Sequence, residues 1–575
     1  MATISIIDGY IDEPTCLGVP PYISPYPRYI AGAIKDFSKE INIKYFTIDQ
    51  IRSNPSLISI FEKSTIIIVI TGMVVPGKYL SGYPLHPKEI IKIFDKIHNP
   101  IKLLCGPAAT FGFGVSGGKK PGYYHDILTI FDALIKGDPE IVISELLKNN
   151  LQLDQINMFQ KRKNAEQIRN YAIKGAEIVS QHPFFPNRLI VEIETYRGCP
   201  RSLTGGCSFC LEPTKGLPDF RSIKSIHDEI HELYSNGIRH FRIGNQPCLF
   251  SYQSEYIGKN ECPKPNPNAI EQLFSGIRKI APDLKTLHID NVNPGVVANY
   301  PDESQKIIQT IVKYHTSGDV AAFGVESVDD AVISQNNLKA DKNMILDAIR
   351  LFNKYGSSIG SNGLSELLPG LNFVFGLKGE TKKTFKENYS FLQNIVKENL
   401  LIRRINLRQV IPLIGTEMEL IGEKIIRKHK KDFQSFKYKV KTTIEQPLLK
   451  KLIPRCAILT DIYPELWKGN ITFGRQIGSY PILVGIPGKY PLNKPLTIKI
   501  IDHGYRSVTG IPYPLNINTC PQKTIESLNG IGKKRAIRII KNRPYDTIKD
   551  LENILDDKEI LSPIIPLISL DENGD

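Results

Sequence analysis

Short apolar runs recur along the first third of the chain, and segments with helical spacing separate them. The strand-like runs lie at 4–8, 41–47, 65–71 and 101–105, and the helical segments include 29–34 and 87–97. Strands that alternate with helices in this way predict a doubly wound parallel sheet. We therefore expect a Rossmann-like α/β domain over residues 1–150, followed by a helical linker over 151–185.

A second alternation of strands and helices fills residues 186–425. Amphipathic helices such as 223–234 separate six segments with a strand pattern, at 189–195, 237–244, 286–290, 321–326, 371–376 and 404–411. Six strand–helix units predict an open, partial (β/α)6 barrel. In barrels of this kind the chemistry lies at the rim that the carboxyl ends of the strands form.

Residues 426–515 have a different composition. Basic residues at 427–431 and 437–441 are interleaved with Phe433, Phe436 and Tyr438. This pattern fits a surface that holds phosphates and stacks on bases, and equally a solvated helix whose apolar stripe faces the core. The β-branched segment 471–514 has many Gly and Pro residues and predicts a small all-β module.

The last segment, 516–575, contains two predicted helices that meet at Leu528-Asn-Gly-Ile-Gly532. Gly530 and Gly532 allow a tight turn and expose backbone N–H groups at a helix start, where anions bind. Lys533, Lys534 and Arg535 add positive charge beside these groups. The hairpin therefore predicts contact with a nucleic-acid backbone, with a protein contact as the alternative.

Charge and composition set wider limits. The net charge of +14 permits a polyanionic partner, but it also fits solubility alone. No apolar run is long enough to span a membrane and no signal peptide is evident, so we expect no membrane association. The nine cysteines are mostly solitary, which favours the reducing cytoplasm over a disulfide framework.

Three of the nine cysteines, Cys199, Cys207 and Cys210, fall within twelve residues at the end of the first barrel strand. Thiolates bind zinc, copper(I) or iron–sulfur centres. A zinc site would need a fourth ligand, and the next cysteines, Cys248 and Cys262, lie far along the chain. Three close thiolates fit a cluster with one open iron, whereas structural cysteines or a zinc knuckle remain the alternative.

The stretch 199–210 resembles the cluster loop of radical S-adenosylmethionine (radical SAM) enzymes, including the aromatic Phe209 before the last cysteine. The seven residues between Cys199 and Cys207 exceed the three usual in that superfamily, and Gly205-Gly206 could form a looped-out turn. The resemblance implies a 4Fe–4S cluster, S-adenosylmethionine bound to its open iron, and an electron donor such as ferredoxin or flavodoxin. It also implies reductive cleavage to a 5′-deoxyadenosyl radical that abstracts a substrate hydrogen.

The resemblance also assigns roles to residues at the rim. The turn Gly244-Asn245-Gln246 corresponds to the one that binds the methionine amine, with Gln246 in place of the usual acid. Glu326 stands where a polar side chain holds the ribose hydroxyls. Gly376 lies in the segment that packs against adenine, and Asn372 and Arg408 point to the same rim. Each could instead be an ordinary strand-end or helix-start residue, and no catalytic side chain is assigned.

His288 and Asp290 form another polar strand end, at Leu287-His-Ile-Asp290. They could bind substrate or shuttle a proton. A satisfied structural network is an equal alternative, because buried polar groups need partners in any case.

Further resemblances concern the flanking domains. Cys105-Gly-Pro and Gly137-Asp-Pro-Glu140 are similar to segments of the N-terminal domain of cobalamin-binding radical SAM enzymes, but the Asp-x-His-x-x-Gly element that supplies a cobalt ligand is absent. This implies the fold more than the cofactor. The β module loosely resembles the RNA-binding TRAM barrel, and the final hairpin resembles the helix-hairpin-helix motif. The whole arrangement resembles a group of archaeal radical SAM proteins.

Three hypotheses follow. The first is modification of a nucleotide in RNA, more readily than DNA, with tRNA as a candidate. The second is a cobalamin-dependent methylase of a small molecule or protein. The third is a nucleic-acid-binding scaffold with a structural cluster. The sequence does not identify the modified atom or the oligomeric state.

Overall fold

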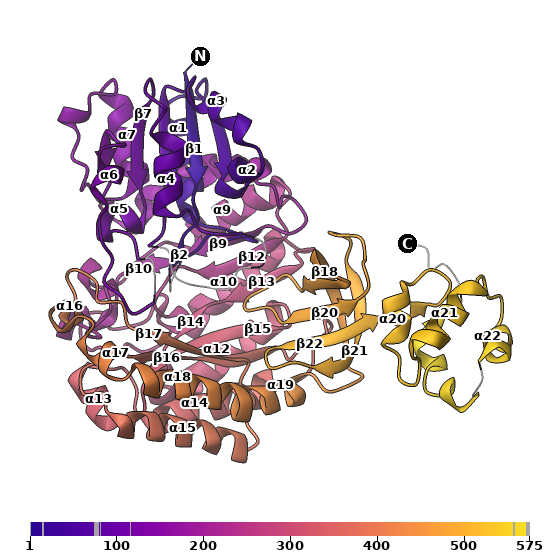
Figure 1. The fold of residues 1–575 in the computed structure, drawn as a ribbon. Helices are drawn as coiled ribbons and strands as arrows, with labels where there is room; N and C mark the ends of the chain where they lie inside the picture. The colour runs from indigo at the N-terminus through magenta and orange to yellow at the C-terminus, as the bar shows by residue number, and fades with distance from the viewer. Residues whose placement is uncertain are drawn as a thin grey trace. The chain divides into compact units, whose positions relative to one another are not determined.

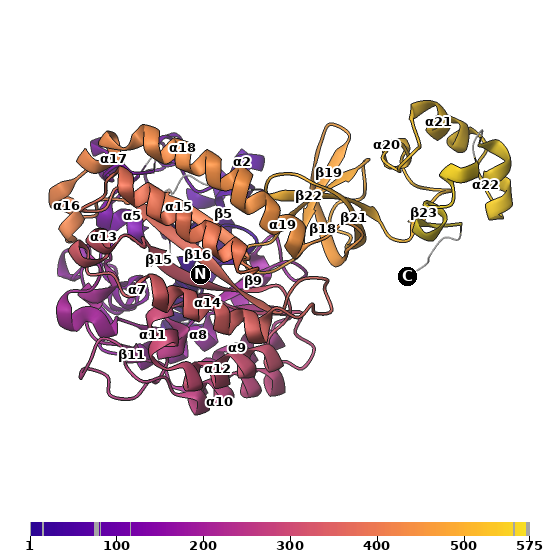
Figure 2. The ribbon, with the colours of Figure 1, turned by 90° about the horizontal axis from the view of Figure 1, so that it is seen from below.

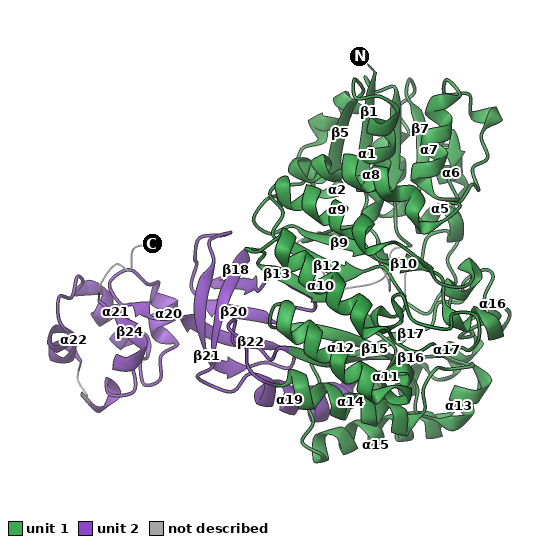
Figure 3. Cartoon of the chain, turned by 180° about the vertical axis from the view of Figure 1, so that it is seen from behind, with its two compact units in different colours: residues 1–357, 367–437 green, residues 358–366, 438–575 purple. Residues whose placement is uncertain are grey.

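We describe a computed structural model that covers residues 2–13, 16–73, 80, 82–114, 117–555 and 558–570 (Figure 1). The chain divides into two compact units, residues 1–357 with 367–437 and residues 358–366 with 438–575 (Figure 3). In the described part of the chain, no helix has both the length and the apolar character needed to cross a membrane.

The first sheet of the N-terminal unit is parallel, as predicted, with the order β5-β1-β6-β7-β8. Its strands are β1 (Thr3–Asp8), β5 (Asn42–Thr47), β6 (Ile66–Ile70), β7 (Ile101–Cys105) and β8 (Ala133–Leu134). All five residues of β6 are buried, which explains the continuous apolar run. The doubly wound α/β prediction is confirmed.

Helices cover both faces of this sheet. One face packs on α2 (Ile48–Ser53), α3 (Ile58–Phe61), α4 (Pro87–Phe94), α5 (Pro107–Phe111) and α6 (His125–Leu128) through a core that includes Ile67, Val69 and Phe94. The other helices are α1 (Pro25–Phe37), α7 (Pro139–Lys148) and α8 (Arg169–Lys174), which meet through Ala33, Ile141 and Tyr171. The predicted helical linker contains α8 and three 3-10 turns, at Leu153–Gln155, Ala165–Ile168 and Ala176–Gln181.

The central part is a row of parallel strands in two sheets, β4-β9-β12-β13 and β14-β15-β16-β17. The strands are β4 (Tyr22–Ile23), β9 (Ile190–Glu194), β12 (His240–Gly244), β13 (Thr286–Ile289), β14 (Asn291–Val292), β15 (Asp319–Glu326), β16 (Leu367–Phe375) and β17 (Arg404–Gln409). Only Asp290 separates β13 from β14, so the six predicted strands are present in order. The short β4, from the N-terminal domain, adds a seventh that the sequence pattern did not reveal.

Helices lie outside these strands, as Figure 2 shows for α12, α14 and α15. They are α9 (Ile223–Ser235), α10 (Pro267–Ile280), α11 (Pro294–Asn299), α12 (Pro301–Tyr314), α13 (Asp330–Gln335), α14 (Lys342–Gly356) and α15 (Lys382–Lys397). The predicted apolar face of α9 is buried through Ile226, Ile230 and Leu233. Its first turn is capped by Ser222, whose hydroxyl accepts the Ser225 N–H at 3.1 Å.

The helices that follow the barrel are α16 (Glu417–Ile421), α17 (Lys424–Lys428) and α18 (Lys430–Val440). Phe433 and Phe436 of α18 are 5% exposed and pack with their rings 5.2 and 5.1 Å from the ring of Phe375. Phe433 and Phe436 therefore form an apolar stripe that faces the core, as the second interpretation of this segment predicted, whereas Tyr438 is 69% exposed.

The C-terminal unit contains α19 (Gln446–Leu452) and a closed five-stranded barrel of order β18-β19-β20-β22-β21. Its strands are β18 (Ile458–Lys468), β19 (Ile471–Arg475), β20 (Leu483–Pro487), β21 (Leu496–His503) and β22 (Ser507–Pro512). Only β20 and β22 pair in parallel among these strands. The predicted small β module is thus a barrel, followed by α20 (Gln522–Glu526), α21 (Lys533–Lys541) and α22 (Ile548–Ile554) around a core of their own.

Candidate functional site

The loop that carries the three close cysteines leaves the carboxyl end of β9. Its base is held by β10 (Tyr196–Arg197), which pairs antiparallel with β11 (Asp219–Phe220). The Tyr196 hydroxyl also donates to the Cys248 carbonyl at 2.6 Å. At Gly198 the φ angle is +85°, and a Cβ there would lie 2.4 Å from the Leu217 carbonyl oxygen, so only glycine fits the loop's base.

Cys199, Cys207 and Cys210 line one cavity, together with Pro247 of the turn after β12. Cys248 lines it too, although the sequence separates this residue from the other three and gave no sign of the convergence. Its sulfur accepts the Asn293 N–H at 3.2 Å. Within the described ranges, no three His, Cys, Asp or Glu side chains are grouped so as to hold a single metal ion.

Two cations border this cavity, and the sequence indicated neither. Arg201 donates to the sulfur of Cys207 at 3.1 Å. Lys339, from the loop after α13, lines the cavity and lies 3.4 Å from the Glu326 carboxylate. Burial would lower the pKa of Lys339, but the carboxylate of Glu326 raises it above its usual range, so this side chain is an ammonium ion.

Burial favours the protonated form of all three thiols. Burial raises the pKa of Cys199 to about 11 and that of Cys210 to about 12, and it also raises the pKa of Cys207. Metal binding would displace these protons.

The turn Gly244-Asn245-Gln246 lies at the rim, but its side chains are engaged within the protein. Gln246 is 1% exposed, accepts from the Thr195 hydroxyl at 3.2 Å and donates to the Ile243 carbonyl. Asn245 has a φ of +56° and donates to Glu194 at 2.7 Å. A Cβ on Gly244 would lie 2.0 Å from Glu192 Oε1, so a larger residue there would displace this buried carboxylate. Because the side chains of this turn are engaged, a ligand would bind to its backbone groups.

Glu326 ends β15 with a φ of +57°, in the left-handed region that costs free energy for a non-glycine residue. Its side chain is buried, one oxygen faces Lys339, and Oε2 has no hydrogen-bond partner among the described residues. A buried carboxylate oxygen without a partner is unfavourable, and a ligand with hydroxyl donors would satisfy it.

The remaining predicted rim residues divide into two kinds. Asn372 accepts from Asn406 of β17 at 2.7 Å, as a strand-to-strand hydrogen bonder would. Gly376 has a φ of +90°, and a Cβ there would lie 2.4 Å from Ile426 of α17, so packing already explains this glycine. Arg408, by contrast, is exposed at the rim. Contacts of all these residues with a cofactor stay predictions.

Glu380 lies beneath the same strand end, where its carboxylate accepts the Gly376 N–H at 2.7 Å. Burial raises the pKa of Glu380 to about 7, from 4.5. The stability that the neutral carboxyl contributes is therefore complete below pH 4.5 and is lost as the pH rises through 7. We expect Glu380→Gln to unfold like the wild type at pH 4 but to be more stable at pH 8, by up to ~3 kcal/mol.

Thermal unfolding of the metal-free protein at both pH values measures this effect. Glu387→Gln, in the helix α15 that follows Glu380, is the matched control, since its partner Lys383 is exposed. A stability difference between wild type and Glu380→Gln that does not depend on pH would contradict the assignment.

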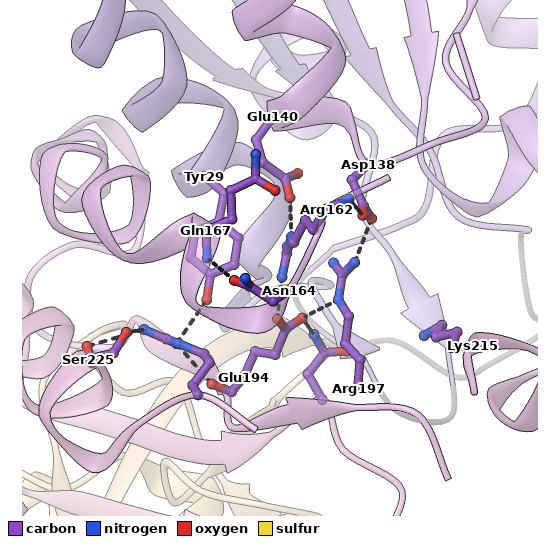
Figure 4. Close-up of polar contacts among 12 residues, drawn as sticks. Tyr29, Asp138, Glu140, Arg162, Asn164, Gln167, Glu194, Arg197, Lys215 and Ser225 are labelled. Carbon is purple, nitrogen blue, oxygen red and sulfur yellow. Dashed lines mark hydrogen bonds and ion pairs between the residues drawn. The ribbon is translucent and has the colours of Figure 1, made fainter. Parts of the chain in front are cut away.

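A buried ion network joins the N-terminal domain to the base of the cysteine loop (Figure 4). Arg162 of the linker contacts Glu140 and Glu194, and Arg197 bonds Asp138 at 2.6 Å. Burial alone would raise the pKa of Glu194, but Arg162 and Arg197 lower it to about 2. Since Glu194 also binds Asn245, the network connects the end of β8 with the turn at the rim.

The His288–Asp290 strand end belongs to a second buried network. Asp290 pairs with Arg242, which also binds Glu192 at 2.6 Å. His288 lies 4.0 Å from Asp319. These contacts support the structural alternative for His288 and Asp290.

The predicted anion-binding turn lies in the C-terminal unit, between α20 and α21. Gly530 has a φ of +80°, and a Cβ there would lie 2.9 Å from Ile560. A Cβ on Gly532 would meet nothing within 4 Å, so this position is open. Lys533 and Lys534 are exposed beside it, whereas Arg535 donates back to the Gly530 carbonyl at 2.9 Å.

Comparison with known proteins identifies the barrel. A family model described as the radical SAM superfamily matches residues 193–392, which include the cysteine loop and strands β12 to β16. Residues 193–392 form a radical SAM domain. Its relatives include an uncharacterized protein of Methanocaldococcus jannaschii, 47% identical over 88% of this chain and 92% of that protein. Another, from Archaeoglobus fulgidus, is 42% identical over 96% of this chain and 97% of that protein.

Solved structures similar to this radical SAM chain include the methyltransferase TsrM from Kitasatospora setae, with tryptophan and a SAM analogue bound. It is 12% identical, with a TM-score of 0.47 over 71% of this chain and 73% of that one. The cobalamin-dependent radical SAM enzyme OxsB, with aquacobalamin and S-adenosylmethionine bound, is 14% identical, with a TM-score of 0.48 over 76% of this chain and 56% of that one.

A radical SAM domain implies a 4Fe–4S cluster and S-adenosylmethionine. The residues of the cavity, with Glu326 beside the cavity residue Lys339, fit both groups. Three soft thiol ligands face one space, and iron–sulfur clusters take such ligands. The oxygen of Glu326 that has no partner among the described residues would accept from the hydroxyls of a ribose. The long first gap is also explained, because Gly205 and Gly206 both have positive φ and loop the extra residues out, as predicted.

Proposed function

We propose that the chain cleaves S-adenosylmethionine reductively and uses the resulting 5′-deoxyadenosyl radical to modify a nucleotide in RNA, with tRNA as the first candidate. Cys199, Cys207 and Cys210 would hold a 4Fe–4S cluster, which would supply the electron for this cleavage. The proposed cleavage of S-adenosylmethionine rests on the cavity at the carboxyl ends of the barrel strands, which these three thiols line. A small electron carrier such as ferredoxin or flavodoxin would supply the electron to the protein.

The residues around the cavity would position the substrate molecule. The backbone of the turn 244–247 would receive the methionine amine, and Glu326 the ribose hydroxyls. Burial raises the pKa of Glu326, whereas the buried ammonium of Lys339 beside it opposes this rise, and either form of the carboxyl group can accept from these hydroxyls. Burial of these groups excludes solvent and so limits side reactions of a reactive intermediate.

The C-terminal unit supports RNA as the substrate. Its barrel is a five-stranded Greek key, the architecture in which strands 2 and 3 and the loop before them bind oligonucleotides. Trp467, beside that loop, is 49% exposed, and its indole N–H donates to the Tyr490 carbonyl at 2.8 Å. Lys489 lies 5.9 Å from the centre of its ring. A ring that is fixed, accessible and beside a cation suits stacking on a base next to a phosphate.

Trp467 is the single tryptophan of the chain, so its fluorescence reports directly on RNA binding. We expect single-stranded RNA to quench this emission, with an affinity that falls steeply with salt. Trp467→Ala should weaken binding of labelled RNA about 5- to 150-fold, which corresponds to the ~1–3 kcal/mol of one stacked base. Phe159→Ala is the matched control, because Phe159 is also exposed and has Lys136 over its ring, but lies in the other unit. An equal loss in both variants, or no quenching, would contradict RNA binding by this unit.

The hairpin allows a second comparison. Gly532→Ala adds a methyl group in open space and should weaken RNA binding without unfolding the hairpin. Gly530→Ala is expected to distort the turn, because the residue has positive φ and packs on Ile560.

The modified nucleosides of a strain that lacks the protein, compared with those of its parent, would identify the substrate. Identical nucleosides would argue against RNA modification.

A second candidate is methylation through cobalamin in the N-terminal domain, whose sheet is doubly wound. At β8 the linker already covers the edge where ligands of such sheets bind, because a Cβ on Gly137 would lie 2.0 Å from the Gln160 carbonyl oxygen. Asp138 and Glu140 are likewise engaged by Arg197 and Arg162. Cobalamin would therefore be held by the ends of β1, β6 and β7. Cobalt that copurifies with the protein would support this candidate, and its absence after growth with cobalamin would contradict it.

A further inference from the structure

We propose that Arg201 is a positioning residue that raises the reduction potential of the cluster by hydrogen bonding to the sulfur of Cys207. The inference rests on the proposed function, because it requires a cluster on the three cysteines. It assigns a role to the extra residues between Cys199 and Cys207.

The extra residues between Cys199 and Cys207 have a defined conformation. Pro200–Thr204 make a 3-10 turn, and Gly205 and Gly206, with φ angles of +84° and +73°, reverse the chain toward Cys207. A Cβ on Gly206 would lie 2.2 Å from Pro213 Cγ, so the reversal is packed against the loop that follows. The turn places Arg201 directly over the cysteine that comes six residues later.

Three bonds fix the guanidinium group. Nη1 donates to Cys207 Sγ at 3.1 Å, Nε to Glu261 at 3.0 Å and Nη2 to Asn337 Oδ1 at 2.8 Å. The residue is 6% exposed. Asn337 in turn donates to the Gly206 carbonyl at 3.0 Å, so it holds both the arginine and the reversal. A planar fork suits this task, since its donors are spread over three nitrogens, whereas the three donors of a lysine share a single nitrogen.

The sign of the effect follows from charge. Reduction adds an electron to the cluster and its thiolates, so a nearby cation and an N–H···S hydrogen bond stabilise the reduced form. Water screens this effect weakly, because the group is buried. Lys339 is a second cation near Cys207, but no hydrogen bond joins it to a cysteine in the described part of the chain.

The test is an EPR-monitored redox titration of the anaerobically reconstituted full-length protein without S-adenosylmethionine. Arg201→Met should favour the oxidised cluster by about tenfold at a given potential, a shift of about 59 mV to more negative values for one electron. Arg201→Lys, which keeps the charge but not the fork, should give a smaller shift. Lys215→Gln is the control, because Lys215 is exposed in the same loop and pairs with Glu212.

Iron and sulfide are counted first in each variant. A wild-type protein without a cluster would refute the proposed function, and the role of Arg201 would fail with it. A full cluster with an unchanged potential in Arg201→Met would overturn only the tuning role. Loss of iron from both arginine variants would also overturn it, because Arg201 would then be needed for assembly.

Discussion

Replacement of any one of Cys199, Cys207 or Cys210 by serine is expected to reduce cleavage of S-adenosylmethionine to background, a loss of at least about 10³-fold, because the cluster carries the chemistry. Serine is a hard oxygen ligand at the metal and does not replace a soft thiolate. Iron and sulfide content and the yield of 5′-deoxyadenosine under strong reductant measure the effect. The fold should survive, since the cysteines lie in a loop whose base is held by β10 and β11.

Cys248→Ser is the most informative control, because Cys248 lines the same cavity. Its sulfur accepts the Asn293 N–H, a hydrogen bond that a serine oxygen can also accept. We expect this variant to keep its iron and its cleavage activity. If it loses its cluster like the other three, four thiolates hold the cluster, no iron is open for S-adenosylmethionine, and the proposed function is wrong.

Arg162→Met is expected to give the largest loss of stability, about 3–5 kcal/mol, because it leaves buried carboxylates without their partner. Arg162 is 4% exposed and contacts Glu140 and Glu194, which are 2% and 1% exposed. Arg169→Met, in the same linker, is the matched control. The Arg169–Asp228 pair is 38% and 27% exposed, so its loss should cost no more than ~1 kcal/mol.

Denaturant unfolding followed by two signals tests this prediction. Far-UV circular dichroism reports mainly on the larger unit, whereas the fluorescence of Trp467 reports on the smaller one. Arg162→Met should shift the first transition to lower denaturant and shift the second much less. Equal stability of the two arginine variants would show that the network does not hold the N-terminal domain to the loop.

The strands could be predicted from the sequence because parallel strands buried on both faces leave continuous apolar runs. The run at 66–70 is an example, since all of its residues are buried. The cysteine loop was equally visible, because its ligands lie within twelve residues. The conformation of Gly205 and Gly206 also followed, since two glycines in an over-long gap have few other uses.

Contacts between residues that lie far apart in the sequence could not be predicted. Lys339 reaches the cavity from the loop after α13 and Cys248 from the turn after β12, and neither has a local pattern that marks it. Phe433 and Phe436 have the spacing of a stacking surface as well as of a core stripe, and only the position of Phe375 decides between the two. The position of Gln246 in the turn predicts a contact with the cofactor, but its side chain is hydrogen-bonded to Thr195 and Ile243.

The central claim is that three thiolates hold a cluster with an iron open to S-adenosylmethionine. EPR spectroscopy of the reduced, oxygen-free protein, before and after addition of S-adenosylmethionine, tests it most directly. We predict the signal of a reduced 4Fe–4S cluster whose shape changes when the compound is added. No cluster signal, or a signal that S-adenosylmethionine leaves unchanged, would contradict the claim.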